Sequence, residues 1–229
     1  MEARLSSSPA GGEAAAPQLA FTIEGGGVLE YAAVPTLRFD LRIDSASDVP
    51  IRSVALNVQV RIAATRRPYD ERDRERLVEL FGQAGDWGRN LRSLHWTNLA
   101  LQVGPFTRST RVEIPVTCTY DLEVTASRYF HALGDGDVPL EFLFGGMIFY
   151  ADPEGRLQVQ PISWNDEAEF KLPVSVWREM MDHHFPNHAW LRLEGHAFDR
   201  LHAYKRDNTL LTWEDTVDSL LRAAGREEA

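Results

Sequence analysis

The stretch VPLEFLFGGMIFYA, from Val138 to Ala151, decides the fold of this protein. It is the longest apolar run of the chain, and Glu141 is its only charged residue. The run is too short to span a bilayer, which needs about 20 apolar residues. Its aromatic and β-branched side chains favour a strand, and the Gly145-Gly146 pair predicts a bulge or sharp bend. We therefore expect a long central strand, kinked at the glycines, with the other strands beside and over it.

Two strictly alternating segments precede this run and predict half-buried strands. Apolar and polar residues alternate from Leu37 to Ile43 and again from Val54 to Ile62. Because a short polar turn joins them, they are expected to form an antiparallel hairpin. Weaker alternating patterns occur in residues 19–23, 94–103, 112–120, 157–159 and 167–172. Six or more strands separated by turn signals predict an antiparallel β-sandwich.

Helical periodicity is found at two places in the chain. Residues 69–81 are rich in charge, with Asp70 as a plausible N-cap, and predict one short amphipathic helix inserted between strands. From Pro173 onward the period changes from two to about 3.6, which predicts about three helices. Thr212 is expected to cap the last helix, whose first turn holds two acidic residues.

The fold class that follows is mainly β (α+β), an antiparallel β-sandwich with an inserted short helix and a C-terminal helical segment. Three regions are expected along the chain. Residues 1–17 predict a disordered tail because alanine, glycine, serine and proline dominate them. Residues 18–172 are expected to form the β-sandwich domain. Residues 173–229 are expected to form a helical segment that packs on it.

Composition limits the classes of partner. The net charge is −10, and an acidic surface disfavours nonspecific binding to nucleic acid or to an anionic membrane. Cys118 is the single cysteine, so the chain has no intrachain disulfide. The first residues contain no apolar segment of the secretory type. These features favour a cytoplasmic protein that is not bound to a membrane.

The chain lacks the common sequence motifs of phosphate binding, dinucleotide binding and nucleophilic catalysis. The sequence has no P-loop, no GxGxxG after a strand and no GxSxG elbow. His184 and His188 have a spacing that would suit a metal on one helical face, but Pro186 lies between them and spoils this geometry. We therefore predict no enzyme activity, no catalytic residues, no metal site and no cofactor.

Two alternative functions stay open at this point. Residues 190–222 have the strand-helix-helix order of ribbon-helix-helix units, which lay a two-stranded ribbon in the DNA major groove. Arg192 would be the lone basic residue of that ribbon, so a DNA-binding regulator is one alternative. A β-sandwich that binds a small molecule is the other.

The segment from Ser163 to Lys205 resembles a known family. Its specific parts are LPVSVWREMMDHHFPN and the WLRL that follows. They are similar to an uncharacterised family of bacterial proteins that carry a domain of unknown function. The resemblance implies gene neighbourhoods with nickel-iron hydrogenase and its maturation genes. It thus implies an accessory role in metalloenzyme assembly. Because the sequence has no recognisable nucleophile, metal cluster or phosphate loop, we predict a non-catalytic accessory or protein-interaction protein.

A protein partner is expected to bind the C-terminal helical segment. That segment holds more large apolar side chains than three short helices need, and such residues are enriched in interface cores. The alternative is that all of them pack on the sandwich. The candidate partner-binding residues are Trp177, Met180, Met181, Trp190 and Trp213.

Overall fold

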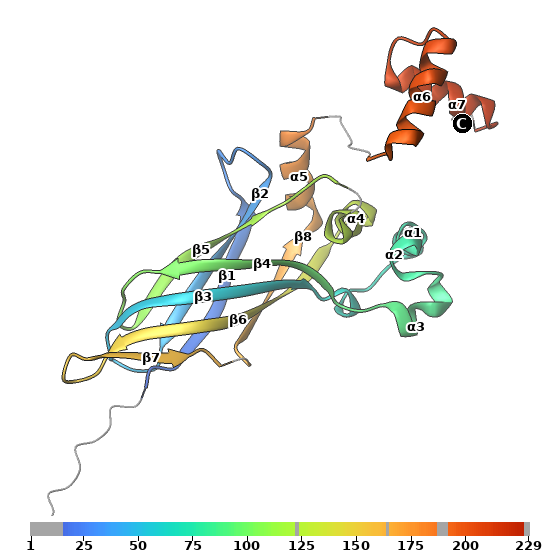
Figure 1. Ribbon diagram of the computed structural model, residues 1–229. Coiled ribbons are helices and arrows are strands. Elements are labelled where there is room, and N and C mark those ends of the chain that lie inside the picture. Colours follow the sequence, from blue (N-terminus) through green and yellow to red (C-terminus); the bar gives the residue numbers. More distant parts are fainter. Residues whose placement is uncertain (1–15, 122–123, 164, 187–191, 227–229) are drawn as a thin grey trace, which may run out of the picture. The chain divides into compact units, whose positions relative to one another are not determined.

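The computed structural model describes residues 16–121, 124–163, 165–186 and 192–226 (Figure 1). The chain divides into two compact units, residues 1–189 and 190–229, which are described separately below. This boundary differs from the predicted one at residue 173, because the first C-terminal helix belongs to the first unit. Most of the predicted tail, residues 1–15, lies outside the described residues.

The first unit contains two antiparallel sheets, which confirms a mainly β fold of the sandwich type. The three-stranded sheet has the order β1-β2-β5, and the five-stranded sheet has the order β4-β3-β6-β7, with β8 also paired to β6. The strands are β1 (Leu19–Val28), β2 (Thr36–Ser45), β3 (Ile51–Ile62), β4 (Leu94–Val103), β5 (Ser109–Thr117), β6 (Asp137–Ala151), β7 (Leu157–Pro161) and β8 (Glu167–Pro173).

The predicted hairpin between the two alternating strands is wrong. β2 pairs with β1 and β5, whereas β3 pairs with β4 and β6, so the two strands lie in different sheets. The polar segment between them carries the chain from one sheet to the other. The alternation itself is confirmed, because Leu37, Phe39, Leu41 and Ile43 are all fully buried.

The core lies between the two sheets and is closed by aromatic contacts. The Phe21 and Phe144 rings stack with centroids 4.3 Å apart. Phe39 contacts Phe142 edge to face at 5.0 Å and Phe170 at 5.8 Å. Because these rings come from both sheets, their contacts fix the sheets face to face, in the manner of a β-sandwich.

β6 is the long central strand that the apolar run predicts. β3 pairs along one side of it. On the other side β8 pairs with residues 137–143 and β7 with residues 147–151, so the partner strand changes at the two glycines. Gly146 has φ of +126°, and a Cβ atom there would lie 2.0 Å from the Ala55 carbonyl oxygen. Only glycine fits this position, because any side chain would collide with the backbone of β3.

Short helices occupy the end of the sandwich away from the β6–β7 turn (Figure 1). The predicted inserted helix begins at its expected cap, since the Asp70 side chain accepts a hydrogen bond from the Asp73 amide at 2.7 Å. It is broken at Leu77 into two shorter helices. The first-unit helices are α1 (Glu71–Arg76), α2 (Val78–Phe81), α3 (Trp87–Asn90), α4 (Thr125–Ala132) and α5 (Val174–His184), with 3-10 turns at Ala64–Arg66 and Ala84–Asp86.

A buried ion pair anchors this helical insertion. Arg67 and Asp73 lie 3.3 Å apart, and both side chains are more than nine-tenths buried. Arg67 also donates to the carbonyl oxygens of Asp135 and Asp137, and Asp73 accepts from the Gly134 amide. These bonds tie α1 to the segment that enters β6, so the insertion and the central strand are positioned together.

The second unit contains two helices, α6 (Gly195–Asp207) and α7 (Trp213–Ala223). α7 begins with a capping box, in which the Thr212 hydroxyl accepts from the Asp215 amide at 3.0 Å and the Asp215 carboxylate accepts from the Thr212 amide. The expected cap of the last helix is thus confirmed. Within the described part of the chain, no helix is long and apolar enough to cross a membrane.

Candidate interaction surface

Three of the predicted partner-binding residues belong to the core. Trp177, Met180 and Met181 of α5 are 3, 0 and 1% exposed. The Trp177 indole stacks on Phe130 at 5.4 Å and lies parallel to Tyr120 at 6.4 Å. The placement of these three side chains on a surface is therefore corrected, because α5 turns its apolar stripe inward. A partner cannot reach them while α5 stays packed.

The other two predicted residues come from the second unit. Trp190 lies outside the described residues. Trp213, the first residue of α7, keeps 38% of its surface exposed. Its ring lies 5.5 Å from Phe198 and 6.2 Å from His202, and the Lys205 ammonium lies 5.7 Å above it. Trp213 thus joins α6 to α7 while offering an accessible indole edge.

α6 and α7 form a helical hairpin, and polar bonds secure its closed end. The Tyr204 hydroxyl lies 2.9 Å from the Ser219 hydroxyl, which links the two helices. The Lys205 ammonium donates to the carbonyl oxygens of Leu210 and Leu211 in the connecting turn. These bonds add to a small apolar contact between the helices, in which Phe198 meets Trp213 and Leu220 lines one pocket with Leu201.

The hairpin exposes most of its large apolar side chains. Within the described residues of this unit Thr216 is the only buried one, and Val217 and Leu221 are 48 and 43% exposed. In α7 the apolar residues recur at a spacing of three and four, which places them on one stripe. We call this stripe with its α6 neighbour the hairpin face, made of Phe198, Trp213, Val217, Leu220 and Leu221.

A unit of this size cannot fold stably on such packing alone. Chains below about 40 residues usually need disulfides, a metal or association. The lone cysteine lies in the other unit, and the described residues contain no group of three or more metal-ligating side chains. Within its own unit, the hairpin therefore leaves much of its apolar stripe uncovered.

The described residues contain only part of the predicted ribbon-helix-helix unit. The two helices of residues 190–222 are present, but Trp190 and Leu191 lie outside the described residues. Arg192 to Glu194 adopt no strand. The expected ribbon is thus not seen among the described residues.

The C-terminal histidines are spread over both units. His183 and His184 end α5, and His184 Nδ1 lies 2.9 Å from the Met180 carbonyl oxygen of its own helix. His196 pairs with Glu194 at 3.2 Å. His188 lies outside the described residues. The His183 and His184 rings lie 5.2 Å apart, and the described histidines belong to no group of three or more metal-ligating side chains.

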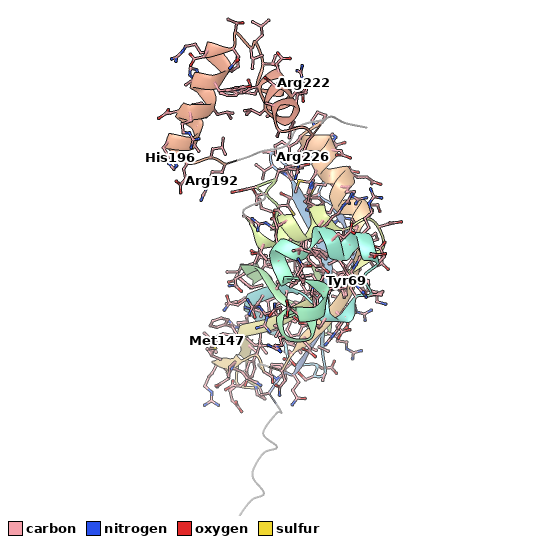
Figure 2. All side chains as sticks on the ribbon, turned by 90° about the vertical axis from the view of Figure 1, so that its right-hand side faces the viewer. Tyr69, Met147, Arg192, His196, Arg222 and Arg226 are labelled. Atoms are coloured by element: carbon pink, nitrogen blue, oxygen red, sulfur yellow. The ribbon has the colours of Figure 1, made fainter. Side chains whose placement is uncertain are left out.

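Sequence reasoning missed a groove on the outer face of the five-stranded sheet. Its volume is 760 Å³, and every residue that lines it is uncharged. The backbone of Gly145 forms part of its wall, and a Cβ atom there would meet open space. Met147, labelled in Figure 2, is 45% exposed on the same strand. Polar and apolar side chains share the lining, among them Asn57, Gln59, Asn98, Leu143 and Pro161.

The Cys118 thiol and the Tyr129 side chain are buried. Burial raises the pKa of the Cys118 thiol to about 12, so the reactive thiolate is scarce at neutral pH. Burial also raises the pKa of Tyr129, whose hydroxyl lies 2.6 Å from that of Tyr69. Tyr69 in turn donates to the Ala64 carbonyl oxygen at 2.7 Å. This tyrosine pair joins the helical insertion to α4.

Comparison with protein families gives one match. A family model described as a family of unknown function, DUF6084, matches residues 16–229. The comparison with curated proteins found no match.

Solved structures give partial and distant matches. The CARDB domain of a Pyrococcus furiosus protein, in complex with di-metal ions, is 14% identical, with 68% of this chain and 91% of that chain covered and a TM-score of 0.27. A putative late embryogenesis abundant protein is 14% identical. The match covers 69% of this chain and 72% of that chain, with a TM-score of 0.32. A Kluyveromyces marxianus β-glucosidase is 12% identical. The match covers 68% of this chain and 15% of that chain, with a TM-score of 0.27.

Proposed function

This chain belongs to DUF6084, a family of unknown function, and on that premise we propose that it is a non-catalytic protein-interaction protein that associates through the hairpin face. The observation that carries the proposal is a helical unit that exposes its apolar stripe and buries only Thr216 among its described residues. Exposed contiguous apolar surface of this kind marks association sites.

The chemistry of the first unit supports a non-catalytic role. The Cys118 thiol is buried and held in its protonated form. The hydroxyls of Tyr69 and Tyr129 bond each other inside the protein. Arg67 and Asp73 neutralise each other and bond backbone groups. Each of these groups has a structural partner, although the buried Nε atom of Arg67 has no hydrogen bond of its own among the described residues.

The finer part of the proposal concerns the partner. The resemblance of residues 163–205 to proteins found beside nickel-iron hydrogenase and maturation genes suggests a bacterial accessory protein, acting in the cytoplasm on a hydrogenase or a maturation protein. An acidic chain, with net charge −10, fits a protein partner better than a nucleic acid.

Affinity capture from the native host tests this function. The full chain is expected to retain a stoichiometric protein partner that a chain lacking residues 190–229 loses. With that partner purified, Trp213→Ser is expected to weaken binding by about tenfold or more, because exposed indoles anchor interfaces. Leu157→Ser is the matched control, since Leu157 is 58% exposed on β7 of the other unit. Retention of the partner by the truncated chain would contradict the proposal.

A second candidate function is favoured by the groove on the five-stranded sheet. Its uncharged lining suits a neutral small molecule. A leucine at Gly145 would enter the open space of the groove without backbone strain. In thermal-shift screening against uncharged metabolites, Gly145→Leu is expected to abolish any stabilisation that the unaltered protein shows. Equal shifts in both proteins would place the ligand elsewhere.

A further inference from the structure

We propose that the hairpin face is covered by the same face of a second copy of this chain, with the two α7 helices antiparallel across a two-fold axis. The inference rests on the proposed function in one respect, because both assign the hairpin face to association. It departs from that function by naming a second copy of this chain, in place of another protein, as the occupant.

The apolar stripe of α7 has the length and shape that self-pairing requires. Trp213, Val217, Leu220 and Leu221 follow one another at intervals of four, three and one residues, and Ala224 continues the stripe. The stripe thus runs along the whole helix. Two hairpins joined through such stripes form a four-helix bundle, which encloses a larger apolar core than a single hairpin has.

The charges of α7 are divided between its two ends. Glu214 and Asp218 lie in its first half, whereas Arg222 and Arg226 lie in its last turn and just beyond it (Figure 2). Among the described residues none of these four side chains forms a salt bridge. Asp215, by contrast, is engaged by the Thr212 cap. Four unpaired charges beside an uncovered apolar stripe are an unusual combination for a finished surface.

Self-complementarity selects the orientation of the pair. When two α7 helices lie antiparallel, the acidic half of one faces the basic end of the other, twice by symmetry. A parallel pair would place like charges together. Exposed ion pairs add little affinity, but flanking charges set orientation and partner choice in paired helices. The charge pattern therefore points to a second, antiparallel copy.

The charges elsewhere in the hairpin agree with this orientation. Arg192 and His196 precede or begin α6 and so lie at the open end of the hairpin, where Arg226 follows α7 (Figure 2). At the closed end, Arg206 is paired with Asp207 at 2.9 Å, and the Lys205 ammonium is held by backbone carbonyl oxygens. Among the described residues, the open end carries Arg192, Arg222 and Arg226 against Glu194, and Glu227 and Glu228 follow Arg226 in the sequence. Antiparallel pairing sets these arginines beside the acidic start of the other α7.

The first test is the mass of the purified full chain, measured by light scattering and sedimentation at micromolar concentration. We expect a dimer. Val217→Asp with Leu221→Asp should raise its dissociation constant by about a hundredfold or more, because charge would be buried in the bundle core. The matched control is Leu157→Asp with Val159→Asp, two exposed residues of β7, which should leave the dimer intact.

A second test keeps the apolar face unchanged. Glu214→Lys with Asp218→Lys leaves Asp215 as the only acidic residue of α7, and Arg222→Glu with Arg226→Glu removes the two arginines of its C-terminal end. Each variant alone should associate about tenfold or more weakly. An equimolar mixture should recover the dimer, a result that unfolding of the hairpin would not produce. Cross-linking should join Glu214→Cys in one chain to Arg226→Cys in another, and not Glu214→Cys to itself.

Three results would overturn the inference. The first is a monomer at all concentrations, as expected if the face is covered within its own chain. The second is a dimer that is insensitive to both sets of α7 variants, and the third is cross-linking of Glu214→Cys to itself. A monomer that binds another protein through Trp213 would overturn the inference and leave the proposed function standing. A dimer that captures no other protein would support the inference and contradict the proposed function.

Discussion

Replacing Gly146 with alanine is expected to reduce the free energy of unfolding by about 4 kcal/mol or more. The new Cβ atom would lie 2.0 Å from the Ala55 carbonyl oxygen, and φ at this residue is +126°. Both the clash and the strain involve backbone, so no side chain can move aside to relieve them. A change of this size is a large share of the 5–15 kcal/mol that holds a typical domain together.

The neighbouring glycine supplies the control. A Cβ atom at Gly145 would meet nothing within 4 Å, so Gly145→Ala should change stability by less than about 1 kcal/mol. Urea denaturation followed by tryptophan fluorescence measures both variants. If Gly146→Ala unfolds at the same urea concentration as the unaltered protein, β6 does not pass Ala55 as described.

The second large effect is expected from truncation. Removal of residues 190–229 should leave the first unit folded, because that unit is compact by itself. Removal of residues 174–229 also deletes α5 and should prevent folding. α5 buries Val174, Trp177, Met180 and Met181. At about 1.5–3 kcal/mol for each buried side chain, their loss amounts to roughly the whole stability of a domain.

Far-UV circular dichroism and cooperative thermal unfolding distinguish the two truncated chains. The longer one should show a sheet-dominated spectrum and a sharp transition, and the shorter one should show neither. Trp177→Ala in the longer chain is a milder version of the same test, with an expected loss of about 3–5 kcal/mol. A shorter chain that unfolds cooperatively would show that α5 is not part of the core.

The sequence by itself determined which faces of the strands are buried and where several elements begin. Alternation in residues 37–43 and 54–62 identified inward side chains, because a strand turns successive residues to opposite faces. The apolar run with its paired glycines identified β6. Asp70 and Thr212 identified helix starts, since a cap needs only a side chain and the next three residues. All of these are local properties.

The tertiary structure alone decided which elements lie side by side. β2 and β3 each have the predicted alternation. This pattern predicts which face of a strand is buried, but it does not predict which strand pairs with it, so the sequence did not show that β2 and β3 lie in different sheets. The groove at Gly145 likewise arises where residues of four strands, β3, β4, β6 and β7, meet. An amphipathic helix looks the same in sequence whether its stripe is covered or open. The structure buries the stripe of α5 against the aromatic end of the sandwich, and it leaves that of α7 exposed, because burial depends on what packs across from a residue.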